Sequence, residues 1–256
     1  MSEVPLDAYL LGVDEPVEDL VEILPEQPFA PSGVQVPVEL LDQLSPMLRL
    51  RRTPPALVEA GLAQRHGGLT PIGQHLSRLH RDPDHRLRVD ATAPDGQTGH
   101  LEASFREGYA AVLATPSPLA PAPGQQRYDV DPFIDVVDAA QVPGVLAAWI
   151  GLRPAWSLAT EPATFPRRYL DARLRSPSAP PPPEADAHLR HVWDQTWTPW
   201  TLRVTAGPTV REMLRTTRTG MVEVRPAETP GDIHLGAAHS SMVWGELIRC
   251  ALACTV

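Results

Sequence analysis

Apolar side chains recur at helical spacing in three stretches near the start of the chain. Residues 14–24 place Val, Leu, Val and Leu on one helical face, with a proline in the first turn. Residues 36–50 carry a second amphipathic pattern, which Ser45-Pro46 interrupts. A third helix is predicted from Pro55 to Ala60, because Gly61 is a typical residue at a helix end.

A fourth helix is predicted from Pro71 to about Arg81. Thr70 is a favourable N-cap, and proline is well tolerated at the first helical position. Apolar residues then recur at helical spacing, and Asp82-Pro83 ends the pattern. Together with the Gly67-Gly68 turn before it, this stretch has the order of helix and turn signals that is common in winged-helix DNA-binding domains. It also suits two helices that only pack together.

Short alternating runs follow, which are typical of strands. Residues 85–117 divide at Pro94-Asp95-Gly96 and at Glu107-Gly108, two sequences that favour hairpin turns. A further strand is predicted at Gln126–Val130. Asp131-Pro132 is expected to open a helix through Val136, Val137 and Ala140, with Val145–Ile150 as its continuation or as a second helix.

The second half of the chain repeats this order. A proline-rich loop, SPSAPPPPE at 176–184, precedes another strand-rich block and a closing helix near 241–253. Leu87–Ala91 (LRVDA) matches Leu202–Ala206 (LRVTA), and Tyr109–Thr115 corresponds to Met221–Ala227 after turns at 106–108 and 218–220. Two such halves are expected to pair around a pseudo-two-fold axis in one antiparallel sheet with helices beside it.

Composition fits a folded, soluble protein, with 43% hydrophobic and 21% charged residues. No apolar run is long enough to cross a bilayer, and the N-terminus lacks a basic leader, so we expect a cytoplasmic protein without membrane insertion. Arginine, alanine and proline dominate, and lysine and asparagine are missing, which suggests a GC-rich, actinobacterial genome. The net charge is −9, and ten acidic residues and no arginine lie within residues 1–48. This acidity argues against nucleic-acid binding.

Catalytic and metal-binding patterns are not found in the sequence. It holds no Gly-x-Ser-x-Gly elbow, no His-Glu-x-x-His and no phosphate-binding glycine loop. His75, His80 and His85 are five residues apart and cannot share one helical face. Asp135 and Asp138 fit a solvated helix face. We therefore predict no enzyme, no cofactor and no metal site.

Three tryptophans, Trp193, Trp197 and Trp200, fall within eight residues. They either pack between the proline-rich loop and the second strand block, or expose one or two indoles as anchors for a protein partner. Both interpretations stay open on the sequence alone.

The winged-helix hypothesis is weakened by the shortness of the turn and by the lack of basic residues in the helix before it. Only AQRHGG separates Leu62 from Leu69, which is too short for a two-stranded wing, and residues 54–60 carry no basic side chain. A DNA-binding transcriptional regulator remains the alternative hypothesis, beside a degenerate enzyme-like binding module.

The order of motifs resembles the EspG family of cytosolic chaperones in actinobacterial type VII (ESX) secretion. The resemblance rests on Gly61-Leu62, Gly67–Thr70, Asp82-Pro83, Leu87–Val89 and Gly108–Leu113 and spans roughly residues 36–253. It implies an α+β fold with a central antiparallel sheet of two pseudo-symmetric halves, flanked by two helical bundles. We expect an acidic segment over 1–35 and one domain over 36–256, with halves at about 36–150 and 151–256.

The same resemblance implies a function without catalysis. Family members bind PE–PPE-type substrate pairs, keep them soluble and deliver them for export, so PE–PPE-like or WXG100-like proteins are the expected partners. By position, the family's β2–β3 loop corresponds to Ala93, Pro94, Asp95, Gly96, Gln97 and Thr98. The helical region around 133–196 corresponds to its second bundle. The predicted partner-binding residues are this loop together with Trp193 and Trp197.

Overall fold

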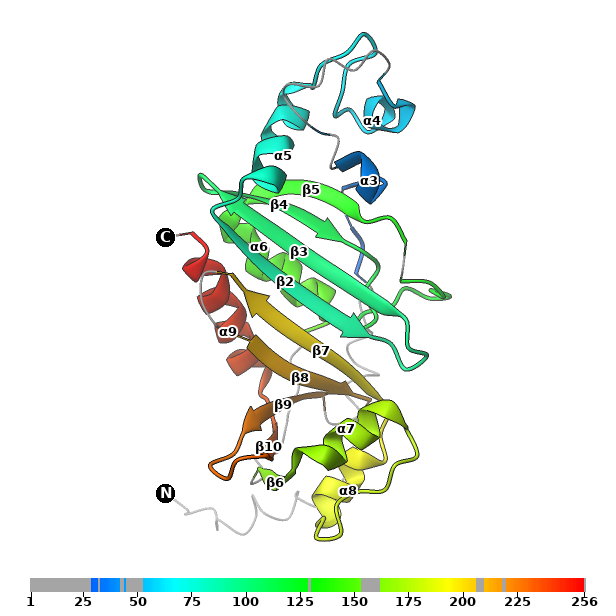
Figure 1. Ribbon diagram of the computed structural model, residues 1–256, viewed down its shortest axis with the longest axis vertical. Coiled ribbons are helices and arrows are strands. Elements are labelled where there is room, and N and C mark those ends of the chain that lie inside the picture. The colour runs from blue at the N-terminus through cyan, green and yellow to red at the C-terminus, as the bar shows by residue number, and fades with distance from the viewer. Residues whose placement is uncertain are drawn as a thin grey trace, which may run out of the picture.

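The computed structural model describes residues 29–31, 33–41, 44, 53–128, 130–152, 162–205, 210–217 and 220–255 of the 256-residue chain. The predicted helix at 14–24, most of the 36–50 pattern and the turn residues 218–219 lie outside these ranges. The described chain is elongated, with a long twisted sheet at its centre (Figure 1).

The elements follow one another in an order that nearly repeats. The first half runs β1 (Val34–Gln35), α3 (Val38–Leu41), α4 (Pro55–Glu59), α5 (Pro71–Arg81), β2 (His85–Thr92), β3 (Thr98–Arg106), β4 (Tyr109–Ala114), β5 (Phe133–Asp138), a 3-10 turn η1 (Ala139–Gln141) and α6 (Val142–Trp149). The second half runs β6 (Ala163–Pro166), α7 (Arg167–Arg175), α8 (Ala187–Trp193), β7 (Trp197–Val204), β8 (Val210–Thr216), β9 (Gly220–Pro226), β10 (Asp232–Ala237) and α9 (Ser240–Ala253).

All ten described strands join one antiparallel sheet in the order β1-β5-β4-β3-β2-β7-β8-β9-β10-β6. Outward from the central β2–β7 pair, each side runs through three consecutive strands and ends on the strand that opens its own half. The order is therefore symmetric about β2 and β7. This confirms the α+β fold with a central antiparallel sheet of two related halves and a group of helices beside each.

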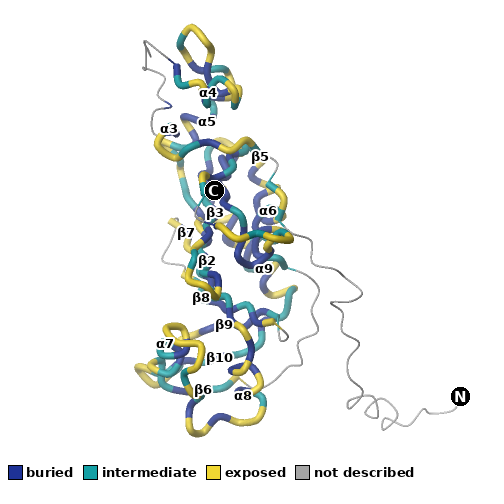
Figure 2. The backbone as a smooth tube through the Cα atoms, turned by 90° about the vertical axis from the view of Figure 1, so that its right-hand side faces the viewer, coloured by how far each residue is buried: buried dark blue, intermediate teal, exposed yellow. Residues whose placement is uncertain are grey.

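The two faces of the sheet are covered differently. Helices α6 and α9 pack on one face and bury the largest cluster of side chains, including Phe105, Trp149 and Trp200. On the opposite face, α3, α4 and α5 cover β4 and β5, while α7 and α8 cover β8, β9 and β10. Figure 2, turned by 90°, shows α6 and α9 on one side of the sheet and α3 and α7 on the other.

The helix over Pro71–Arg81 begins and ends where the sequence predicts. Thr70 is its N-cap, and the Thr70 Oγ1 atom accepts a hydrogen bond of 3.1 Å from the Gly73 amide. Its buried leucines face Ala111, Leu113 and Ile134 of β4 and β5. Leu87 of β2, by contrast, belongs to the cluster on the other face of the sheet.

Strands β2, β3 and β4 confirm the predicted meander and both of its turns. Glu107 and Gly108 form the two-residue connection between β3 and β4, with φ of 52° and 82°. Positive φ at both positions is the signature of a type I′ hairpin, which suits the twist of the strands. The predicted strand at residues 126–130 is wrong, because residues 125–128 belong to no strand.

The helix predicted from Asp131 is also wrong. Phe133–Asp138 is the strand β5, paired along its whole length with β4, and the helix starts only at Val142. The Asp-Pro pair resembles a helix start, but the following FIDVV is rich in β-branched and aromatic residues that suit a strand. Asp135 and Asp138 therefore lie on a strand and not on a helix.

Candidate functional site

None of the described helices covers the centre of the sheet on the face opposite α6 and α9. Strands β2, β3 and β7 lie between the α3–α5 group and the α7–α8 group on this face (Figure 1). Alternation along the strands places β2 residues 86, 88 and 90, β3 residues 100 and 102, and β7 residues 201 and 203 on it. We call this set the central face.

Charged side chains of both signs line the central face. Arg88 donates from Nε to Asp90 Oδ1 at 2.9 Å, and Arg203 Nη1 lies 3.5 Å from Asp90 Oδ2. Asp90 therefore joins the two arginines across the β2–β7 pair. The hydrogen bond to Asp90 raises the pKa of the Arg88 guanidinium above its usual value. The side chains of Arg88 and Arg203 are still 46% and 58% exposed, so both can reach a partner.

Glu102 extends this network along β3. Its carboxylate lies 3.6 Å from Arg88 Nη1 and 3.8 Å from Arg86 Nε. Arg86 also donates to the His80 carbonyl at 2.8 Å, which ties the face to helix α5. His100 lies opposite Asp90 in the β2–β3 pair. Burial and then the nearby Arg88 lower the pKa of His100, so its ring is neutral at physiological pH.

A bidentate ion pair closes the other side of the face. Arg167 is the first residue of α7, and its Nη1 and Nη2 atoms each donate to Glu212 of β8 at 2.7 Å. Its Nε donates to Asp171 at 3.0 Å. Burial lowers the pKa of Arg167, but the hydrogen bonds to Glu212 and Asp171 outweigh it and raise the pKa overall. The two parallel hydrogen bonds fix the start of α7 against β8, beside the central face.

The loop predicted for partner binding is the tip of the β2–β3 hairpin. Of Ala93–Thr98, residues 94–96 and 98 are exposed, Gln97 is half-buried and Ala93 is buried. Asp95 accepts hydrogen bonds from the amide and the side chain of Gln97, at 3.0 and 2.9 Å. Gln97 Nε2 donates to the Gln126 carbonyl at 2.9 Å. The tip is thus held firmly while its outer residues stay accessible.

The two tryptophans assigned to the partner surface lie in the interior. Trp193 and Trp197 are 2% and 5% exposed, and their rings meet edge to face at 5.0 Å. Trp193 Nε1 donates to Ala179 of the proline-rich loop at 2.8 Å, and the Arg173 guanidinium lies 4.8 Å from the Trp197 ring centroid. Both indoles therefore pack α8, the loop and β7 together, and neither is an exposed anchor in the described structure.

Two grooves lie towards the two ends of the sheet. One of about 560 Å³ lies where α5 meets β5 and β1, with Ile72 63% exposed and Val34 41% exposed at its opening. The other, of about 350 Å³, lies between α7 and the end of the proline-rich loop and is lined by Phe165, Tyr169 and Leu189 among others. Neither was singled out from the sequence, because each is assembled from segments far apart in the chain.

The described residues contain no group of three or more His, Cys, Asp or Glu side chains placed to hold a metal ion. Cys250 and Cys254 are buried, and burial raises the pKa of each thiol to about 11, so both are protonated at neutral pH. Among these residues no helix is both long enough and apolar enough to span a membrane.

The arrangement of the sheet also recurs in a solved structure. The type VII secretion system chaperone EspG5 of Mycobacterium tuberculosis, solved in complex with a PE25–PPE41 dimer, superposes with a TM-score of 0.50 at 12% sequence identity. The match covers 88% of this chain and 97% of that one. The chain has an EspG-like fold. No family model matches the sequence, and neither does any curated protein.

The match leaves out little of either chain, so the likeness extends over most of the fold. At 12% identity the likeness concerns the path of the chain and not its individual side chains.

Proposed function

We propose that the protein is a chaperone or adaptor that binds type VII secretion substrates of the PE–PPE-like or WXG100-like class in the cytoplasm and keeps them soluble until export. The single observation that carries this proposal is the EspG-like fold, because the neighbour is a chaperone in complex with a PE–PPE dimer. The function needs no catalysis, and binding alone accounts for it.

The central face and the hairpin loop form the proposed contact surface. Arg88 and Arg203 extend from the middle of the sheet, and the outer residues of Ala93–Thr98 project past the end of β2 and β3. A secreted helical pair has an apolar tip that must be covered before export. The groove between α7 and the proline-rich loop supplies apolar walls of Phe165 and Leu189 for it.

Trp193 and Trp197 support this surface from beneath. Because they are buried against α8 and the proline-rich loop, they set the position of the groove walls without contacting the partner in the free chain. Within the proposed single domain of 36–256, they belong to the second half.

Winged-helix DNA binding is the weaker candidate. The helix before the Gly67-Gly68 turn, α4, is five residues long and has no basic side chain, and only the isolated bridge between Ala63 and Leu69 links the segments around the turn. A recognition helix needs basic residues that enter the major groove.

Co-expression tests the proposal. The tagged chain is expressed with the PE–PPE-like or WXG100-like proteins encoded beside it, and complexes are recovered by affinity and size-exclusion chromatography. We expect one pair to co-purify stoichiometrically and to be more soluble than when expressed alone. A folded chain that retains none of them, or that binds its own promoter DNA at low salt, would contradict the proposal.

A further inference from the structure

Four arginines gather on the α9 side of the second half of the sheet. Arg211 and Arg215 lie on β8, Arg225 on β9 and Arg249 on α9. Val224 pairs with Glu212, so Arg225 and Arg211 are neighbours on adjacent strands and face the same side. We call these four residues the basic cluster.

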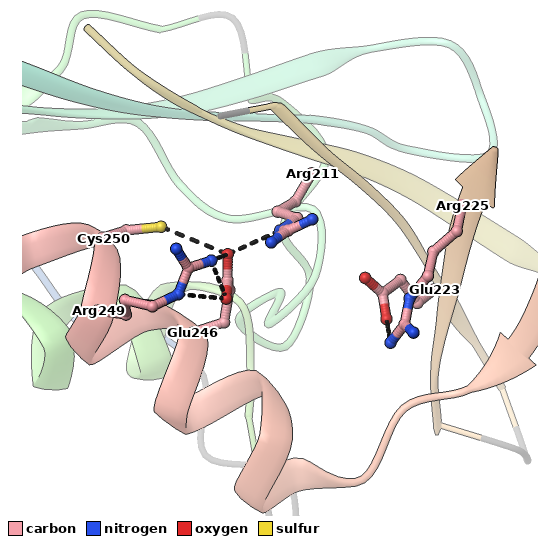
Figure 3. Close-up of polar contacts among 6 residues, drawn as sticks. All are labelled: Arg211, Glu223, Arg225, Glu246, Arg249 and Cys250. Carbon is pink, nitrogen blue, oxygen red and sulfur yellow. Dashed lines mark hydrogen bonds and ion pairs between the residues drawn. The ribbon is translucent and has the colours of Figure 1, made fainter. Parts of the chain in front are cut away.

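Two glutamates partly balance the basic cluster. Glu246 accepts from Arg211 Nε at 2.7 Å and from Arg249 Nε at 3.1 Å, and Arg225 pairs with Glu223 (Figure 3). Burial raises the pKa of Glu246, but the hydrogen bonds from Arg249 and Arg211 outweigh it and hold the pKa below its usual value. Without counting Arg215, the three guanidinium groups of Arg211, Arg225 and Arg249 exceed the two carboxylates by one positive charge.

The excess charge is accessible to a further anionic group. The side chains of Arg225 and Arg249 are 55% and 57% exposed, whereas Glu223 and Glu246 are only 16% and 22% exposed. One helical turn before Glu246, Met242 is 50% exposed on the same face of α9. The surface thus offers exposed guanidinium groups beside an exposed apolar side chain.

The chain enters the described structure on this same side of the sheet. Phe29 packs against the cluster beneath α6 and α9, and its amide donates to the Ala120 carbonyl at 3.1 Å. A β-carbon at Gly151 would lie 3.2 Å from Ala120 Cβ and 2.3 Å from Arg215 Nη1. Ala120 and Arg215 therefore border the same glycine, and Phe29, which is hydrogen-bonded to Ala120, lies on the Arg215 side of the basic cluster.

The residues before Phe29 have the complementary chemistry. Residues 1–28 contain eight Asp or Glu and no Arg, Lys or His. Between 14 and 24, the sequence DEPVEDLVEIL mixes five acidic residues with four that are apolar and at helical spacing. We propose that this acidic segment docks in cis on the basic cluster, with its carboxylates on Arg225 and Arg249 and its apolar side chains towards Met242.

Because residues 1–28 are covalently joined to Phe29, this segment is favoured over a separate anionic molecule as the ligand of the basic cluster. A tethered segment is present at roughly millimolar effective concentration, so ion pairs and apolar contacts that together give only about millimolar affinity are enough to hold it. Docking covers charge on the face opposite the central face, and it is independent of the proposed chaperone function.

Paramagnetic relaxation enhancement in the full-length protein tests the docking. A spin label is placed on Gly12→Cys, 17 residues before Phe29. The native Cys250 and Cys254 are each 2% exposed, so they do not compete for the label. We expect selective broadening of amide signals in β9 and α9, which 1 M NaCl removes because salt screens exposed ion pairs.

The double variant Arg225→Gln and Arg249→Gln should abolish that broadening. The control Arg65→Gln and Arg175→Gln removes the same charge from exposed sites elsewhere and should preserve it. If the first variant does not fold, changing the eight acidic residues of 1–28 to their amides tests the same contact without altering the described chain. Broadening that survives these changes, that falls on the central face, or that arises between labelled and isotope-enriched copies in a mixture would overturn the proposal.

Discussion

Arg88 and Arg203 lie directly opposite each other in the β2–β7 pair, at the centre of the ten-stranded sheet. The LRV sequences that contain them begin at Leu87 and Leu202, so the two arginines hold equivalent positions in the two halves. The pseudo-two-fold axis therefore passes through this pair of like charges, and Asp90 is the carboxylate that both contact.

Removing that carboxylate should destabilise the fold modestly. In Asp90→Asn, Arg88 and Arg203 face each other without a shared counter-charge. We expect the free energy of unfolding to fall by about 0.5 kcal/mol, a small value because both arginines are partly exposed. Urea unfolding at low and high salt measures it, and the loss should shrink at high salt. Glu59→Gln, at an exposed site on α4, is the matched control. The same Asp90→Asn change is then made in a chain that already carries Arg203→Gln. If it lowers the free energy of unfolding there by as much as in the unaltered chain, Asp90 does not interact with Arg203 and the shared contact is contradicted.

Two helical glycines should respond to alanine with opposite signs. A β-carbon at Gly73, the third residue of α5, would lie 1.9 Å from the Leu62 carbonyl oxygen, whereas one at Gly144, the third residue of α6, meets nothing within 4 Å. We expect Gly73→Ala to cost about 1–3 kcal/mol through overpacking. Gly144→Ala should gain about 0.5 kcal/mol. Thermal unfolding of both variants checks this, and similar shifts in the two would refute the close approach of α5 to Leu62.

His100 should make the stability depend on pH. Burial lowers its pKa in the folded state, so at mildly acidic pH the unfolded chain binds a proton that the folded chain does not. This contribution is complete above about pH 6.5 and is lost as the pH falls below that value towards the folded pKa. Unfolding measured between pH 7.5 and 5 should show a slope that His100→Gln reduces. An unchanged slope would assign the dependence to other groups.

Trp193 should contribute to stability and not to partner binding. Trp193→Phe retains a ring in the cluster but removes the hydrogen bond to Ala179, which we expect to cost about 1 kcal/mol. Titration of the folded variant with the partner pair should give the affinity of the unaltered chain. A tenfold loss of affinity at full folding would instead place this indole in the partner contact.

The sequence predicted the parts of the fold in which local signals and tertiary pairing agree. The Thr70 cap, the Glu107-Gly108 turn and the LRV repeat each depend on a few neighbouring residues, and each was placed correctly. The strand β5 was missed because Asp131-Pro132 suggests a helix start, while its pairing with β4 is a long-range effect. Helices α7 and α8 carry weak local signals and are held by the buried tryptophans.

The candidate site could be predicted only in part for the same reason. The hairpin loop at 93–98 is local, so its position follows from the Pro94-Asp95-Gly96 turn. The central face is defined by which strands the helices leave uncovered, and that cannot be read from any one segment. The alternation of Arg88 and Asp90 with buried residues shows only that they share a face.

The most direct test of the account is the affinity of the purified chain for a PE–PPE-like pair, measured by isothermal titration calorimetry. We expect a defined 1:1 complex of chain and pair that Asp95→Arg, at the exposed hairpin tip, weakens at least tenfold. Glu228→Arg, at the exposed turn between β9 and β10, makes the same charge change and should leave the affinity unaltered. Absence of binding by the folded chain, or equal affinity for all three proteins, would contradict the proposed chaperone function or its proposed contact surface, respectively.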